Sequence, residues 1–188
     1  MARFSLGSDW RRLFWMGSLI LLSVAFSLGF SCAVPLAPFA TIGALTLRRH
    51  DAFVLIGAVW LANQMTGFAL LHYPLERTAF AWGLALGAVA VLATLAAQWV
   101  NGRLSGRNRV LGSSATFLAA FAAYEGALFA ISTASANGVS NFAPAIVLRI
   151  FLINAVAFAV LLLVHRLIAV RGLENKEETL LSAQRVLY

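Results

Sequence analysis

The sequence feature that most constrains the fold is a series of long apolar stretches. Residues 78–100 contain no charged side chain, and similar, mostly apolar runs cover residues 13–30, 53–72, 110–135 and 142–170. About 20 predominantly apolar residues are enough for a helix to cross a bilayer. A helix also satisfies its backbone hydrogen bonds internally, as a chain in lipid must. The pattern therefore predicts an all-α, polytopic membrane protein.

A further apolar run, residues 36–47, follows the segment SCAVPLAP, in which Pro35 and Pro38 disfavour a continuous helix. This run is too short to cross an average bilayer upright unless it begins inside that segment. With it, we predict six transmembrane helices in a domain of residues 13–170. A cytoplasmic N-terminal arm (1–12) precedes the domain. A charged C-terminal tail (171–188) follows it as a short exposed helix or a disordered segment.

Composition excludes several classes of function. The 188 residues are 61% hydrophobic and 11% charged, whereas soluble domains are about half apolar and a quarter charged. The net charge of +7 comes from short basic clusters between apolar runs, which indicates membrane topology rather than nucleic-acid binding. The single cysteine, Cys32, excludes an internal disulfide, and a zinc cluster would need more ligands than the chain offers. No phosphate-binding loop and no nucleophile–base pair is recognisable, so we do not expect an enzyme or a prosthetic group.

The distribution of basic residues predicts the orientation. Lys and Arg cluster in the N-terminal arm and after the second, fourth and sixth runs, whereas the other three connections contain only Arg77. Cytoplasmic loops carry the excess of basic residues. We therefore expect both termini in the cytoplasm. SCAVPLAP, HYPLER and ANGVSN are then on the outer face.

Polar residues within the apolar runs fall in one layer. At ~1.5 Å per residue, Asn63 and Gln64 lie roughly 12–14 Å below the outer end of their helix. The corresponding depths are roughly 15 Å for Glu125, roughly 10 Å for Arg149 and roughly 18 Å for Asn154. A charge in the bilayer core costs from a few to more than 10 kcal/mol unless it is paired or hydrated. The similar depths make Glu125 and Arg149 candidate partners.

Two interpretations of this layer remain open. In one, Glu125 and Arg149 form a buried ion pair that sets helix register, and the amides only link helices. In the other, the layer is the floor of a cavity that opens to the outside, because ionisable groups in a membrane usually mark a site. Candidate residues at the mouth of such a cavity are Cys32, His72, Tyr73 and Trp82. For each of these there is also a plain alternative, namely an interfacial aromatic, a small packing residue or a surface hydrogen bond.

Small residues also suggest a packing seam. Gly83 and Gly87 form a G-x-x-x-G pattern among alanines, which lets two helix backbones approach closely in lipid. The seam would serve either packing within this chain or contact with a partner subunit.

The stretches WLANQMTGFALLHYP (residues 60–74) and AWGLALGAVAVLATLAA (residues 81–97) resemble the BtuM-like cobalamin transporters. These are related to the substrate-binding S-components of energy-coupling factor (ECF) transporters. The six-helix layout is also similar to that of S-components. The resemblance implies an S-component-like bundle in a bacterial inner membrane that binds cobalamin or a related corrinoid at the outer face for vitamin uptake. It also implies a possible energising partner, a transmembrane subunit with ATPases.

The resemblance further implies roles for individual residues. Some members are thought to ligate cobalt through a cysteine in an outer loop, but the loop between the third and fourth helices has none here. His72 and Cys32 are the candidate axial ligands, since imidazole and thiolate both suit cobalt. The expected substrate-binding residues are Asn63, Gln64, His72, Tyr73, Trp82, Glu125 and Arg149. Alternatives are the same architecture for another vitamin or a metal, or a non-transport assembly or structural subunit.

Overall fold

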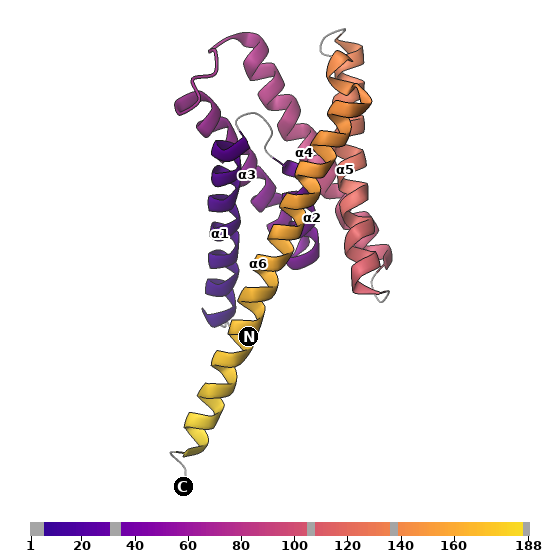
Figure 1. The fold of residues 1–188 in the computed structure, drawn as a ribbon. Coiled ribbons are helices and arrows are strands. Elements are labelled where there is room, and N and C mark those ends of the chain that lie inside the picture. Colours follow the sequence, from indigo (N-terminus) through magenta and orange to yellow (C-terminus); the bar gives the residue numbers. More distant parts are fainter. Residues whose placement is uncertain (1–5, 31–34, 105–107, 136–138, 186–188) are drawn as a thin grey trace.

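The computed structural model describes residues 6–30, 35–104, 108–135 and 139–185 (Figure 1). These residues form the α-helices α1 (Leu6–Phe30), α2 (Leu36–Thr46), α3 (Arg49–Ala69), α4 (Arg77–Leu104), α5 (Arg109–Ala134) and α6 (Pro144–Arg185), and a 3-10 turn, η1 (Val139–Phe142). All of the α-helices except α2 are long and apolar enough to cross a membrane. The chain is therefore an all-α, multi-pass membrane bundle, as its hydropathy predicts.

The short helix α2 lies at the centre of the bundle. Its 11 residues extend over ~16 Å, about half of a ~30 Å hydrocarbon core. Residues 36–44 are all buried, and α2 packs against α3, α4, α5 and α6. Pro38 is accommodated because it lies in the first turn, where a missing N–H breaks no helical bond. The expected second span is thus a core helix of half-span length, and the described residues contain five full-length spans rather than six.

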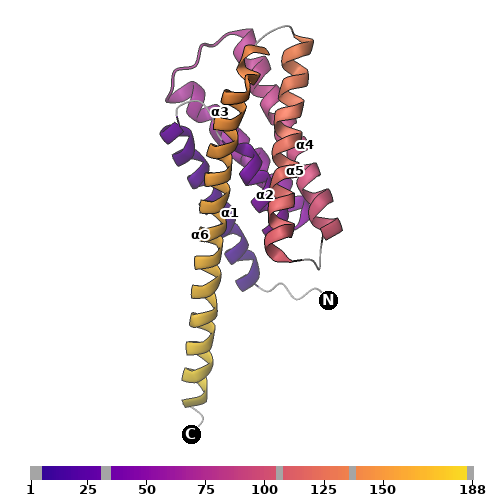
Figure 2. The same ribbon diagram turned by 45° about the vertical axis from the view of Figure 1, so that its right-hand side comes forward.

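Four side-chain contacts define one end of the bundle, here called the basic end. Arg12 Nη1 lies 3.2 Å from Asp51 Oδ2, which joins α1 to α3. Trp15 Nε1 donates to Thr46 Oγ1 at 3.1 Å and joins α1 to α2. On α4, Gln98 and Asn101 donate to the backbone carbonyls of Arg49 and Ala44, respectively. The start of α1 and the end of α6 also lie at this end (Figures 1 and 2).

The first and last helices extend beyond the predicted spans. α1 begins at Leu6, so part of the expected N-terminal arm is helical. α6 continues without a break to Arg185 through most of the expected tail. Its candidate span ends at Ile168, and the remainder projects past the other helices at the basic end (Figure 1).

The glycines of α4 form the seam with α3. A Cβ at Gly87 would lie 2.9 Å from the Trp60 ring, and one at Gly83 would lie 2.6 Å from Gln64 Oε1. Trp60 Nε1 also donates to the Gly83 carbonyl at 2.7 Å. The absence of side chains at these two positions therefore allows packing within this chain, which is one of the two uses expected for the G-x-x-x-G pattern.

Candidate functional site

A cavity of about 270 Å³, here called the amide cavity, lies in the half of the bundle away from the basic end. It is lined by residues of five helices and of the connection between α3 and α4. The lining residues are Ser27, Leu36, Asn63, Gln64, Phe68, Leu71, Tyr73, Pro74, Ala79, Trp82, Gly83, Leu86 and Tyr124. Leu36 is the first residue of α2, so the start of the half-length helix forms part of the cavity wall.

The amides Asn63 and Gln64 both reach this cavity. Asn63 Oδ1 lies 3.4 Å from Ser27 Oγ, but the Ser27 hydroxyl has one proton and donates it to the Ser23 carbonyl at 2.8 Å. Asn63 therefore keeps most of its hydrogen-bonding capacity for the cavity. Gln64 lies over Gly83, where α3 and α4 meet, and it also lines an apolar hollow on the outside of the two helices.

The chain reverses sharply where α3 ends, and this turn forms the mouth of the cavity. His72 has a φ of 53°, in the left-handed region that histidine enters more often than most residues. The Tyr73 amide then donates to the Gly67 carbonyl at 3.1 Å. The Tyr73 ring packs on Gly67, where a Cβ would lie 2.6 Å from Cε2. Tyr73 thus lines the cavity, whereas the exposed His72 is outside the lining.

The remaining aromatic residues of the cavity come from α4 and α5. Trp82 is half-buried and lines the cavity, as expected for a residue at its mouth. Tyr124 is 8% exposed and contributes a side chain that the sequence analysis missed. Its position next to Glu125 in the polar layer could have identified it, but consecutive residues point about 100° apart around a helix.

The two charged residues of the expected layer are not brought together. Glu125 is half-buried and Arg149 is exposed, and neither lines the amide cavity. The ion pairs between described residues join Asp51 to Arg12 and to His50, so the expected pairing of Glu125 with Arg149 was wrong. Phenylalanine rings that pack against each other, rather than an ion pair, join α5 to α6.

Two further residues of the sequence analysis lie elsewhere. Asn154 is 2% exposed and donates to the Ile150 carbonyl at 2.9 Å, and its Oδ1 has no partner. It is outside the cavity lining. Cys32 lies outside the described residues, so its distance from the cavity is undefined. In the part of the chain that the structure describes, no three His, Cys, Asp or Glu side chains gather as a metal site.

Chemically, the cavity combines two amides, two tyrosines and a tryptophan within an otherwise apolar wall. Such a lining suits an organic solute with hydrogen-bonding groups and a flat, apolar face. Comparison of the chain with known protein families, with curated proteins and with solved structures finds no match in any of the three.

Proposed function

We propose that this protein binds a small organic solute in the amide cavity and takes part in its uptake across a bacterial inner membrane. One observation carries the proposal. Asn63, Gln64, Tyr73, Trp82 and Tyr124, which come from α3, α4, α5 and the α3–α4 connection, line one cavity. Polar groups at membrane depth are costly, and they usually mark a substrate path or site.

The orientation that fits this role follows from charge. The basic end contains Arg12, Arg48, Arg49 and Arg103, and the positive-inside rule assigns that end to the cytoplasm. The termini are then cytoplasmic, and the amide cavity belongs to the outer half of the membrane, where a solute would arrive.

The ligand we favour from the sequence resemblance is cobalamin or a related corrinoid. Its amide side chains suit Asn63 and Gln64, and its ring suits contact with Tyr73 or Trp82. Because a corrin ring is much larger than a cavity of about 270 Å³, the ring would lie over the mouth, within reach of the exposed His72. Cys32 remains the second candidate cobalt ligand.

The cavity volume supports a second candidate, a smaller vitamin that the cavity encloses. About 270 Å³ is near the lower limit of small-molecule pockets. In either case, the described chain contains no recognisable ATP-binding motif. Uptake would therefore proceed alone or with an ECF-type energising module, a transmembrane subunit with its ATPases.

An absorption spectrum of the purified protein tests cobalamin binding. Adding hydroxocobalamin to the wild type should shift the corrinoid bands, and either His72→Asn or Cys32→Ser should abolish the shift. Asparagine is the informative replacement at residue 72, because it also adopts the left-handed backbone but lacks the imidazole. If equilibrium dialysis shows that cobalamin binds but the spectrum does not shift, neither His72 nor Cys32 ligates the cobalt, although the protein still binds the corrinoid.

A binding screen across vitamins separates the two ligand candidates from a structural role. Asn63→Leu should weaken binding of the true ligand, whereas Asn154→Leu, a buried amide outside the cavity, is the matched control. If no vitamin binds the wild type, and if both variants only lower the amount of folded protein, the chain is an assembly or structural subunit and the proposal is wrong.

A further inference from the structure

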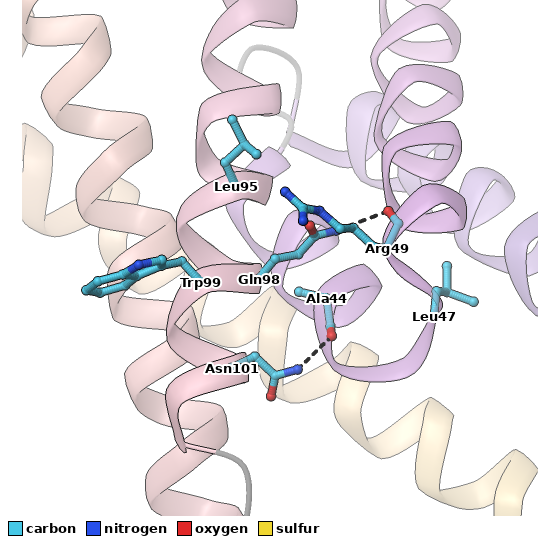
Figure 3. Close-up of a pocket in the computed structure, with 8 residues that line it drawn as sticks. Ala44, Leu47, Arg49, Leu95, Gln98, Trp99 and Asn101 are labelled. Atoms are coloured by element: carbon cyan, nitrogen blue, oxygen red, sulfur yellow. Dashed lines mark hydrogen bonds between the residues drawn. The ribbon is translucent and has the colours of Figure 1, made fainter.

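A second hollow with a different chemistry lies at the basic end, and it is independent of the proposed function. This arginine pocket has a volume of about 320 Å³ and lies between the end of α2, the start of α3 and the end of α4. In Figure 3 the Arg49 side chain reaches from α3 toward α4 and lies over Gln98. The end of α2 contributes Ala44 to the pocket, and Leu47, the residue after α2, also lines it.

The pocket is positively charged and lacks a balancing carboxylate. Arg49 is exposed and forms no ion pair with any residue that the structure describes. Arg103 is outside the lining, and its guanidinium lies 4.2 Å from the centroid of the Trp99 ring, which does line the pocket. Gln98 holds the Arg49 carbonyl through Nε2, and its Oε1 is buried without a partner. An anion with hydroxyl groups would complement both features.

A second, apolar hollow lies one helical turn further along the seam between α3 and α4, since Val91 lines it and Leu95 lines the arginine pocket. This hollow of about 250 Å³ is also lined by Gly57, Trp60 and Leu84, and together with the turn of α4 that leads to it from Leu95 it is here called the furrow. From Leu95 to Leu84 the furrow spans ~16 Å, which matches one leaflet of a ~30 Å hydrocarbon core. The arginine pocket is thus at headgroup level and the furrow at acyl-chain level.

We propose that the arginine pocket binds an anionic phospholipid with a polyol headgroup. The phosphate lies against Arg49, a headgroup hydroxyl donates to Gln98 Oε1, and one acyl chain occupies the furrow past Leu95. The charge, the unpartnered acceptor and the apolar hollow one turn further along α4 together distinguish such a lipid from a free anion. Basic pockets between helices at the cytoplasmic face bind lipid headgroups in this way.

Native mass spectrometry of the full-length protein in detergent tests the proposal with two lipids of identical acyl chains. Phosphatidylglycerol should be retained about fivefold more than phosphatidylcholine, the ratio expected from ~1 kcal/mol per arginine near the surface. Arg49→Gln should abolish this preference, and it leaves the backbone carbonyl that Gln98 holds. Arg48→Gln is the matched control, because it removes the same charge one residue away and outside the pocket lining.

A second variant fills the pocket without removing charge. A Cβ at Gly102 meets open space, so Gly102→Leu should fold and should displace the lipid. Gly126→Leu, which also enters open space but on α5, should leave retention unchanged.

Three results would overturn the proposal. The first is equal retention of the two lipids by the wild type. The second is equal effects of Arg48→Gln and Arg49→Gln, which would indicate diffuse surface charge. The third is displacement of phosphatidylglycerol by inorganic phosphate at the same concentration, which would indicate an anion site without an acyl-chain contribution. Melting temperatures measured without added lipid separate loss of the lipid from loss of the fold.

Discussion

Gly83 and Gly87 lie one turn apart on α4, and a side chain of α3 packs against each of them. The two side chains differ in flexibility. Gln64, which lies over Gly83, is flexible and can move away. Trp60, which lies over Gly87, is a rigid ring that is also held by its hydrogen bond to the Gly83 carbonyl. Within the same G-x-x-x-G pattern, Gly83 therefore makes room for a residue of the cavity wall, and Gly87 makes room for the ring that packs α3 against α4.

Gly87→Ala should destabilise the protein. The new methyl group would lie 2.9 Å from the Trp60 ring, and overpacking of this kind costs about 1–3 kcal/mol. Gly57→Ala is the control, because a Cβ there meets open space and alanine stabilises a helix by about 0.5–1 kcal/mol relative to glycine. Unfolding by sodium dodecyl sulfate in mixed micelles measures both. If Gly87→Ala leaves the unfolding free energy unchanged, the Trp60 ring can move away without cost, which would contradict this prediction.

The separation of Glu125 from Arg149 is testable in a double-mutant cycle. Single and double replacements by glutamine should give additive changes in unfolding free energy, with coupling below about 0.5 kcal/mol. Additivity is expected because no ion pair joins the two residues in the described structure. Coupling between about 0.5 and 3 kcal/mol would instead restore the pairing that their depths suggested.

These two residues also show what sequence reasoning could not supply. Depth follows from counting residues, and the four residues that it grouped in the outer half, Asn63, Gln64, Tyr73 and Trp82, line one cavity. Rotation about each helix axis does not follow, because helices that are apolar all round carry no clear inward face. For this reason Tyr124 was not predicted, and Glu125 was paired with Arg149 although no ion pair joins them in the described structure.

At the scale of elements, α2 is the helix whose role hydropathy alone could not identify. An apolar run reads the same whether lipid or protein surrounds it, so only its length distinguished it from the other spans. The boundaries of α3, α4 and α5 were predicted to within four residues, because charged or proline residues flank most ends of these apolar runs, whereas α1 and α6 extend beyond their runs. The structure surrounds α2 with α3, α4, α5 and α6, which makes it the common packing partner of the bundle.

Replacing a buried side chain of α2 by alanine should therefore lower the free energy of unfolding. Phe39 is fully buried, and Phe39→Ala should lower the unfolding free energy by about 3–5 kcal/mol, through lost contacts and the cavity left behind. Phe14→Ala is the matched control on α1, where the ring is 59% exposed and the change should stay within about 0.5 kcal/mol. Equal losses in the two variants would contradict a central role for α2.

For the whole molecule, the alternation of helix direction brings the connections to two ends of unequal charge. Contacts among α1, α2, α3 and α4 gather Arg12 and Arg49 at the basic end, while the α3–α4 connection lies at the other. In a membrane this charge asymmetry predicts the orientation of the protein, because cytoplasmic loops carry the excess of Lys and Arg.

Cysteine labelling tests that direction. In a Cys32→Ser background, Glu76→Cys should react with a membrane-impermeant maleimide added outside intact spheroplasts. His50→Cys, whose parent side chain is 88% exposed at the basic end, should react only after the membrane is opened. The reverse pattern would place the termini outside and overturn the proposed uptake direction.

The half-length helix also connects the two hollows. Leu36 at one end of α2 lines the amide cavity, and Ala44 near the other end lines the arginine pocket. If this helix of 11 residues moves as one body, a ligand that shifts α2 at one end would change the affinity at the other end. Thermodynamic reciprocity would then make the factor the same in both directions. Lipid composition of the inner leaflet would then tune how tightly a solute is held at the outer face.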